Sequence, residues 1–161
     1  MGDLRDKRKG VLRVAASQLM ACTLMPIVLA AYRRQYPGVE IHLRDTQPEN
    51  LLELLHSGEV EVLVGPDGAL DEAGLRRHPV LNDKHWLICR ADDLLARRRH
   101  LRWQDLAGRA FVAPTRDFVA RMRAILGAYS EPLLATPGTE TSYFTTAFGL
   151  VSAGMGVTLC P

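Results

Sequence analysis

The sequence predicts an α/β fold of two lobes that share a cleft, and three observations lead to this prediction. From Gly10 onward, short apolar stretches of strand length alternate with longer stretches of helical spacing, which is typical of a parallel sheet with right-handed crossovers. The alternation is interrupted after the turn cluster at residues 65–68 and begins again near Ala110. The length of 161 residues suits either one ordinary domain or two small lobes.

The composition excludes several broad classes of protein. An apolar fraction of 47% and a charged fraction of 24% are close to globular averages and argue against disorder or a fibrous repeat. No apolar run reaches the roughly 18 residues of a membrane span. A net charge of only +2 argues against a nucleic-acid-binding domain. Three widely spaced cysteines, Cys22, Cys89 and Cys160, predict buried thiols in a reducing cytoplasm rather than a disulfide or metal site.

Residues 7–22, KRKGVLRVAASQLMAC, have some features of an export signal. Basic residues precede an apolar run, and a Leu-x-Ala-Cys sequence of the kind that receives a lipid ends at Cys22. A signal needs about 7 to 15 uninterrupted apolar residues, however, whereas Arg13 and the polar pair at residues 17–18 interrupt this run. We therefore interpret the segment as the first piece of the fold.

The first strand and the first helix come from this segment. Residues 11–14 begin a short strand, and residues 15–17 leave it. A helix comes next, with Pro26 in its first turn, where the missing N–H costs least. Its spacing predicts one buried face that carries Leu24, Ile27, Val28, Ala31 and Tyr32.

The rest of the first lobe continues the alternation. Residues 39–43 predict a strand, residues 48–56 a helix that ends at Ser57-Gly58, and residues 60–65 a buried third strand. Two short strands without a helix between them come after it, at residues 75–81 and 85–90. This change of rhythm is where the chain is expected to leave one lobe and enter the other.

The second lobe repeats the theme. Asp92-Asp93 is expected to cap a short helix that ends in the basic run at residues 97–100, which suits the helix dipole. The later elements are predicted as a strand at residues 110–114, a helix at 116–129 with Phe118, Met122, Ile125 and Leu126 inward, a short strand or link at 137–141, a helix at 143–153 and a strand from 157.

These elements divide the chain into five predicted parts. Residues 1–9 are a linker or remnant, 10–84 the first lobe, 85–90 a hinge strand, 91–156 the second lobe and 157–161 the start of a return strand.

Ligands of parallel α/β sheets bind at the carboxyl ends of the strands. This rule selects polar turns in both lobes: Ser17, Gln18, Thr46, Gln47, Gly65 and Pro66 in the first, and Thr115, Arg116, Thr141 and Ser142 in the second. Hydroxyls, amides and free backbone N–H groups in these turns suit a small anion such as a carboxylate. The alternative interpretation is that Ser17, Thr115 and Ser142 are simply N-caps.

Catalytic motifs are absent from the sequence. It contains no GxSxG, Walker or HExxH motif, and its five histidines are scattered. Residues 154–156, Gly-Met-Gly, are only part of a dinucleotide fingerprint and come after a helix rather than a strand. The sequence therefore predicts a protein that is not an enzyme and that binds neither metal nor cofactor.

Fragments along residues 10–161 resemble the effector-binding domain of LysR-type transcriptional regulators. The resemblance rests on the order and separation of GVLRVAAS, LMPIVLAAYRRQYPGVEIHL, LLELLHSGEVEVLVG, LRRHPVLNDKHWLICRADDLLA, WQDLAGRAFVAP and GLVSAGMGVTLCP. It implies the type 2 periplasmic-binding-protein fold, with two Rossmann-like lobes and an interlobe cleft. Glu61 departs from the family, which usually has Asp there.

The resemblance implies a sensor of a small-molecule effector, often an organic acid or aromatic carboxylate, that binds between the lobes and changes a DNA-bound oligomer. It assigns effector contacts to Ser17 and to Thr115 with Arg116, and more weakly to Thr46, Gln47, Gly65 and Ser142. It also implies a homodimer or tetramer that pairs residues 24–35 with residues 144–153 of a partner.

The resemblance carries two further expectations. DNA binding would depend on an N-terminal helix-turn-helix that these residues lack, and the first lobe would lack its last strand and covering helix after Pro161. The main alternative is a solute-binding protein of a transporter, which shares the fold but needs an export segment; residues 1–9 are too short and too charged to provide one. An enzyme on the same fold needs an acid, a base or a cofactor anchor, and none is found.

Overall fold

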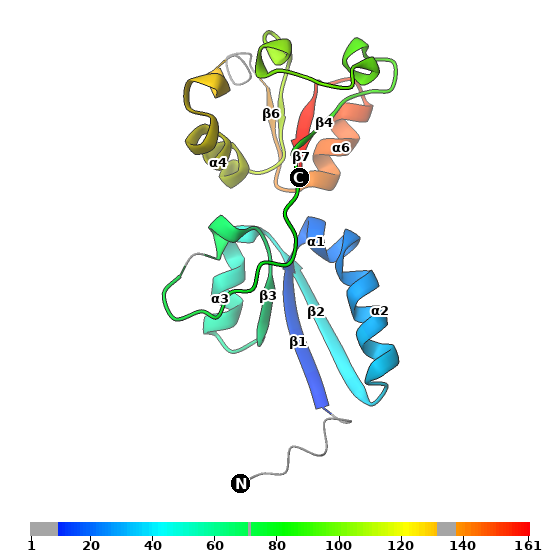
Figure 1. The fold of residues 1–161 in the computed structure, drawn as a ribbon, viewed down its shortest axis with the longest axis vertical. Coiled ribbons are helices and arrows are strands. Elements are labelled where there is room, and N and C mark those ends of the chain that lie inside the picture. The colour runs from blue at the N-terminus through cyan, green and yellow to red at the C-terminus, as the bar shows by residue number, and fades with distance from the viewer. Residues whose placement is uncertain (1–9, 71, 132–137) are drawn as a thin grey trace. The chain divides into compact units, whose positions relative to one another are not determined.

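A computed structural model of the chain describes residues 10–70, 72–131 and 138–161, except for the side chains of residues 116, 117, 129 and 130 (Figure 1). The chain divides into two compact units, Met1–Pro79 (unit 1) and Val80–Pro161 (unit 2). None of the helices in the described ranges combines the length and the apolar character that a bilayer crossing requires.

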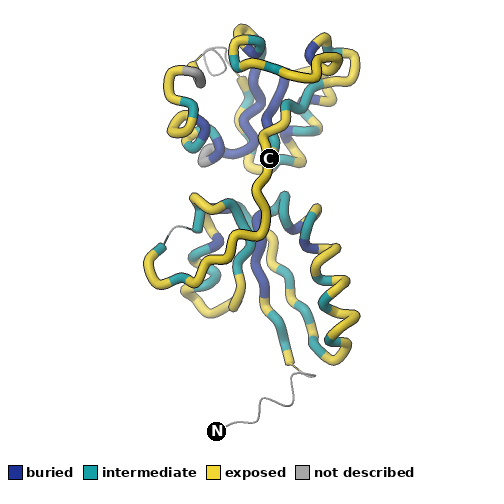
Figure 2. The backbone as a smooth tube through the Cα atoms, in the orientation of Figure 1, coloured by how far each residue is buried: buried dark blue, intermediate teal, exposed yellow. Residues whose placement is uncertain are grey.

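Unit 1 contains a parallel sheet of three strands in the order β2-β1-β3. These are β1 (Gly10–Ser17), β2 (Val39–Thr46) and β3 (Val62–Val64), as the sequence predicted in type and order. Both β1 and β2 run three residues further than expected, because their pairing continues to the end of each strand. Burial is concentrated in the second half of β1, where four consecutive residues are buried (Figure 2).

Helices cover both faces of this sheet. The helical segments are α1 (Gln18–Thr23), α2 (Met25–Gln35), the 3-10 turn η1 (Pro48–Asn50), α3 (Leu51–His56) and the 3-10 turn η2 (Asp67–Ala69). One core cluster joins Val14 and Ala16 to Ala21 and Met25 of α1 and α2. A second joins Ala15 to Leu51 and Val60. Successive residues of β1 thus enter opposite clusters, as the alternation of side chains along a strand requires.

The predicted buried face of the first helix is wrong. Ile27 is 72% exposed and Val28 is also exposed, whereas Met25 is buried and Leu29 packs against the same core cluster. Met25 and Leu29 are four residues apart and share a helix face, so Ile27 points away from the sheet. Pro26 lies in the first turn, as predicted.

Unit 2 contains a small mixed sheet. Strand β4 (Trp86–Ile88) pairs antiparallel with β7 (Thr158–Cys160), and β5 (Val112–Ala113) pairs parallel with β6 (Thr139–Glu140). One parallel bridge between Phe111 and Val157 joins the two pairs. The segments predicted as hinge and return strand therefore pair with each other inside unit 2; their finer boundaries stay predictions.

The helices of unit 2 pack around this sheet. They are the 3-10 segments η3 (Leu94–Arg97), η4 (Trp103–Leu106) and η5 (Gly127–Ser130), and the longer helices α4 (Arg116–Leu126) and α6 (Phe144–Ser152). The main core cluster includes Phe111, Phe118, Met122, Val157 and Leu159.

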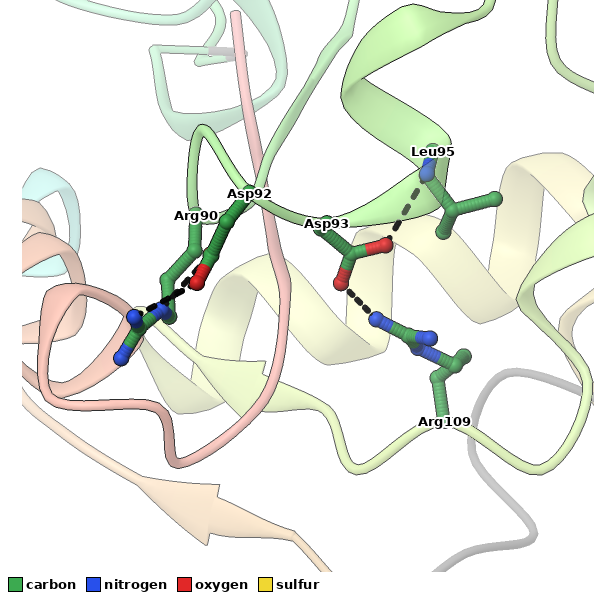
Figure 3. A network of polar contacts seen from close by, with 5 residues as sticks. All are labelled: Arg90, Asp92, Asp93, Leu95 and Arg109. Carbon is green, nitrogen blue, oxygen red and sulfur yellow. Dashed lines mark hydrogen bonds and ion pairs between the residues drawn. The ribbon is translucent and has the colours of Figure 1, made fainter.

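A polar network fixes the start of unit 2's first helical segment (Figure 3). Asp93 caps η3, as predicted: its carboxylate accepts a hydrogen bond from the Leu95 N–H at 2.9 Å, and it also pairs with Arg109, which precedes β5. Beside it, Arg90 donates two hydrogen bonds to Asp92, at 2.9 and 2.7 Å. These bonds lower the pKa of Asp92 and raise that of Arg90.

Two other sequence predictions are wrong. Residues 75–81 form no strand, because no described strand pairs with them, and Val80 and Leu81 are exposed. Ile125 does not point inward but is 69% exposed; Leu126, four residues after Met122, packs against the core instead. Of the predicted strand or link at 137–141, residue 137 lies outside the described residues.

Candidate functional site

The three polar turns predicted in the first lobe do meet at one edge of the unit 1 sheet. Ser17 and Thr46 are register partners at the ends of β1 and β2. Val64 pairs with Ala16, so Gly65 comes after β3 at the level of Ser17. Ser17 is buried, with 6% of its surface exposed, and Thr46 and Gly65 are partly buried. The hydroxyl groups of Ser17 and Thr46 and the backbone of Gly65 therefore lie along this edge.

Ser17 does not act as a conventional N-cap. It directly precedes α1, but its side chain makes no capping hydrogen bond to that helix. Ser17 is only 6% exposed, so its hydroxyl lies at a mostly buried position without capping the adjoining helix. Ser17 thus occupies the N-cap position of α1 but does not cap the helix with its side chain.

The neighbouring candidates in unit 1 have simpler roles. A Cβ at Gly65 would lie 2.6 Å from the side chain of Leu51, which is fully buried, so packing against α3 explains the glycine. Gln18 and Gln47 are partly buried and each takes part in a polar interaction. Pro66, also partly buried, precedes η2.

Thr115 in unit 2 is an N-cap. It is 4% exposed, and its hydroxyl oxygen accepts a hydrogen bond of 3.0 Å from the N–H of Phe118 in the first turn of α4. The hydroxyl proton is not used by this bond and can still be donated. Arg116 is the first residue of α4, and its side chain lies outside the described residues.

Thr141 brings the two polar turns of unit 2 together; the sequence predicted it, with Ser142, in the polar turn before the next helix but assigned it no effector contact. Its N–H donates to the Ala113 carbonyl at 2.8 Å. Its hydroxyl lies 3.3, 3.2 and 3.1 Å from the carbonyl oxygens of Ala113, Pro114 and Tyr143. The one signal in the sequence is a threonine directly between a short strand and a helix, which is too common to identify such a residue.

Ser142 is not the cap of α6. The N-cap position is Tyr143, which makes no side-chain capping bond, and Ser142 is exposed with a polar interaction of its own. The N-cap interpretation is therefore wrong for Ser142.

Aromatic rings lie behind the Thr115 turn. The ring of Phe118 is buried and meets the ring of Phe144 edge-on, with centroids 5.7 Å apart. The imidazole of His85 lies 6.0 Å from the same Phe118 ring, and Phe144 in turn contacts Phe148. Since Phe118 also donates its N–H to Thr115, this cluster anchors the turn on its inner side.

The chemistry available at these turns is hydrogen bonding. Serine, threonine and glutamine side chains do not titrate near neutral pH, so they cannot serve as general acids or bases there without a partner. Within the described ranges, no group of three or more His, Cys, Asp and Glu side chains could hold a metal ion. The arrangement suits recognition of a small polar molecule.

Comparison with known proteins gives one family. The model of the LysR substrate binding domain matches residues 5–161. The transcriptional dual regulator GltC of Bacillus subtilis is 29% identical over 160 residues, which cover 97% of this chain and 52% of GltC. The chain thus spans about half the length of this curated relative.

Solved structures share the fold. The C-terminal domain of a probable LysR family transcriptional regulator from Rhodococcus sp. RHA1 has a TM-score of 0.80 at 22% identity, covering 94% of this chain and 74% of that one. The BenM effector binding domain with its effector benzoate has a TM-score of 0.73 at 20% identity, covering 94% and 70%.

Proposed function

Because the chain belongs to the LysR substrate-binding-domain family, we propose that it is the ligand-sensing domain of a bacterial transcriptional regulator and that its effector is a small carboxylate. The observation that carries the proposal is Ser17, a buried hydroxyl at the carboxyl end of a parallel strand that makes no capping bond. A hydrogen-bond donor kept at the ligand-binding edge of such a sheet is expected to serve a ligand.

The chemistry of the turns indicates the effector class. Hydroxyl and backbone N–H groups donate to an anion, and benzoate, the effector of the structurally similar BenM domain, is a carboxylate. We assign the main contacts to Ser17 in unit 1 and to Thr115 with Arg116 in unit 2. Thr46, Gln47, Gly65 and Ser142 are secondary. No role in catalysis is assigned to any of them.

The test is ligand-dependent stabilisation of the whole chain. A panel of carboxylates that contains benzoate, succinate and acetate is screened by thermal shift, because a ligand present at 100 times its Kd stabilises the folded state by about 2.7 kcal/mol. Ser17→Ala and Thr115→Ala should each reduce this shift. Thr146→Ala, which removes an exposed hydroxyl from α6, is the matched control. If both site variants respond like the control, the assignment of the site is wrong.

We further propose that the domain works as a homodimer, or a tetramer built from such dimers. The exposed apolar residues of α2, Ile27 and Val28, support a pairing of this helix with α6 of a second copy. Ile27→Glu should convert the dimer to a monomer in sedimentation experiments. Ile125→Glu, which places the same charge at an equally exposed isoleucine of α4, should leave the dimer intact.

In the whole regulator, we assign DNA binding to a helix-turn-helix and the protein to the cytoplasm. The family match supports this assignment over the transporter alternative. These 161 residues are expected to cause no sequence-specific gel shift on the regulator's own promoter. A specific shift by this chain alone would contradict the assignment.

A further inference from the structure

Three carbonyl oxygens converge on the hydroxyl of Thr141. They belong to Ala113 and Pro114, at the end of β5, and to Tyr143, at the start of α6, at 3.3, 3.2 and 3.1 Å. The hydroxyl has one proton to donate, so the three acceptors share it. This single side chain therefore ties the start of α6 to the end of β5, across 28 residues of sequence.

The bond to Pro114 matters because Thr115 is the next residue along the chain. Proline has no N–H, so its carbonyl is the only backbone group by which Pro114 can be held. That carbonyl belongs to the same peptide plane as the N–H of Thr115. If the plane turns, Thr115 turns with it, and the bond from the Phe118 N–H to the Thr115 hydroxyl is strained.

We propose that Thr141 is a positioning residue that fixes the orientation of the Thr115 turn through the Pro114 carbonyl. The consequence for effector binding rests on the proposed function of Thr115; the positioning itself does not. Thr141 holds the end of β5 with two groups, since its N–H also donates to Ala113 at 2.8 Å. The Thr141 N–H holds the end of β5, and the Thr141 hydroxyl fixes the orientation of the turn that contains Thr115.

The test measures amide hydrogen exchange by NMR on the whole chain. Thr141→Val keeps the side-chain volume but removes the hydroxyl, and it should speed exchange of the Phe118 N–H about tenfold, which is the effect of losing one ordinary hydrogen bond. Thr141→Ser restores the hydroxyl and should restore slow exchange. Thr146→Val makes the same atomic change at an exposed site of α6 and should leave exchange of the Phe118 N–H unchanged.

A measurement on the unaltered chain covers the case in which Thr141→Val does not fold. The amides of Phe118 and Thr141 should then open together, with protection factors that agree within about threefold, because one link holds both. Rapid exchange of Phe118 beside a protected Thr141 would overturn the proposal, as would unchanged Phe118 exchange in Thr141→Val.

The outcomes separate this inference from the proposed function. If Thr141→Val frees the Phe118 N–H while Thr115→Ala leaves the thermal shift with the carboxylate panel unchanged, Thr141 positions a turn that does not bind the effector. If Thr115→Ala abolishes that shift while Thr141→Val leaves exchange unchanged, the effector contact stands and the positioning role of Thr141 is wrong.

Discussion

In both unit 1 and unit 2 a buried hydroxyl residue at or just after the end of a parallel strand precedes a helix, yet the two hydroxyls behave differently. Thr115 has an extended backbone, with φ −156° and ψ 156°, and its side chain reaches the N–H of Phe118. Ser17 has φ −59° and ψ 144° and makes no capping bond. The same local sequence signal, a hydroxyl residue between strand and helix, therefore gives a cap in one unit and none in the other.

The difference separates a buried hydroxyl that stabilises its own helix from one that makes no bond to its helix. Most buried polar side chains in folded proteins form a hydrogen bond, so a hydroxyl that makes no bond to its own helix is a candidate for contact with a ligand. Thr115 contributes to the stability of α4 whether or not a ligand binds. Ser17 contributes no such bond to α1, and it is therefore the cleaner indicator of a binding site.

The largest expected effect on stability comes from a substitution that disrupts the pairing of β5 with β6 in unit 2. Gly138 lies just before β6, and a Cβ there would overlap the carbonyl oxygen of Phe111, which is backbone and cannot move aside. Gly138→Ala should destabilise the chain by about 3 kcal/mol, the upper end of ordinary overpacking. Urea denaturation, followed by tryptophan fluorescence, measures this loss.

Gly149→Ala is the matched control for Gly138→Ala. Gly149 lies in α6, and a Cβ there meets no atom within 4 Å. The substitution should stabilise the chain by about 0.5–1 kcal/mol through the higher helix propensity of alanine. Equal effects of the two substitutions would show that the close approach of β6 to β5 is not required.

The next effect compares the two hydroxyls directly. Thr115→Ala removes an N-cap bond and should cost about 1.5 kcal/mol of unfolding free energy, within the range of measured caps. Ser17→Ala removes no cap and should change stability by less than about 0.5 kcal/mol, because an unbonded hydroxyl gives up little when it is replaced by an apolar group. Urea denaturation of both variants measures the two changes in unfolding free energy.

Thr115→Ser serves as the control for the cap, since it keeps the hydroxyl and should retain most of the stability that alanine loses. A Ser17→Ala variant that is as unstable as Thr115→Ala would mean that the Ser17 hydroxyl has a structural bond after all. The contrast between the units would then disappear.

The sequence predicted the existence of helices and strands more accurately than it predicted which face of each helix is buried. The pattern of apolar residues was enough to predict the three strands of unit 1, and Pro26 was enough to locate the first turn of α2. The exposure of Ile27 could not be predicted, because a helix with apolar residues on several sides is oriented by the sheet it meets. The strand predicted at residues 75–81 does not form, because a strand also requires a neighbour to pair with.

The candidate site shows the same limit. Ser17, Thr46 and Gly65 could be placed at one edge because parallel strands end together. Their separate roles could not be predicted, because capping depends on backbone angles that composition does not determine. Thr141 was predicted in a polar turn, but its bonding role was not, because its three acceptors come from the end of β5 and the start of α6 and only the folded chain brings them together.

A third buried hydroxyl sharpens the comparison. Thr158 in β7 is fully buried, and its hydroxyl has no hydrogen-bond partner among the described residues. Its register partner is Ile88, and it alternates with the core residues Val157 and Leu159, so it faces away from their cluster. Thr158→Val should therefore stabilise the chain by about 1 kcal/mol, because it removes an unsatisfied polar atom at almost constant volume.

The Thr158 measurement uses the same urea titration, with Thr141→Val as the opposite case. Both substitutions replace threonine by valine in unit 2, but Thr141 loses hydrogen bonds and should destabilise. If Thr158→Val destabilises as well, its hydroxyl has a partner such as a buried water, and lack of a visible bond is no guide to function at Ser17 either.

The smallest expected effect concerns acid stability. Asp105 in unit 2 accepts a hydrogen bond of 2.8 Å from the Arg102 N–H and another of 2.8 Å from the Arg98 guanidinium. The Arg102 N–H first, and then Arg98, hold the pKa of Asp105 below its ordinary value of 3.8. Because the folded-state pKa is the lower one, this stabilisation is present above pH about 4 and is lost as the pH falls through the folded-state pKa.

Asp105→Asn should therefore be slightly less stable than the unaltered chain at pH 7, and the difference should shrink steadily below pH about 4 as the carboxylate is protonated. The urea midpoints of both proteins from pH 7 to pH 3 measure it. Asp45→Asn, an exposed carboxyl on β2 in unit 1, is the control. A difference between Asp105→Asn and the unaltered chain that stays constant over this range would mean that Asp105 acts through the shape of its side chain and not through its charge.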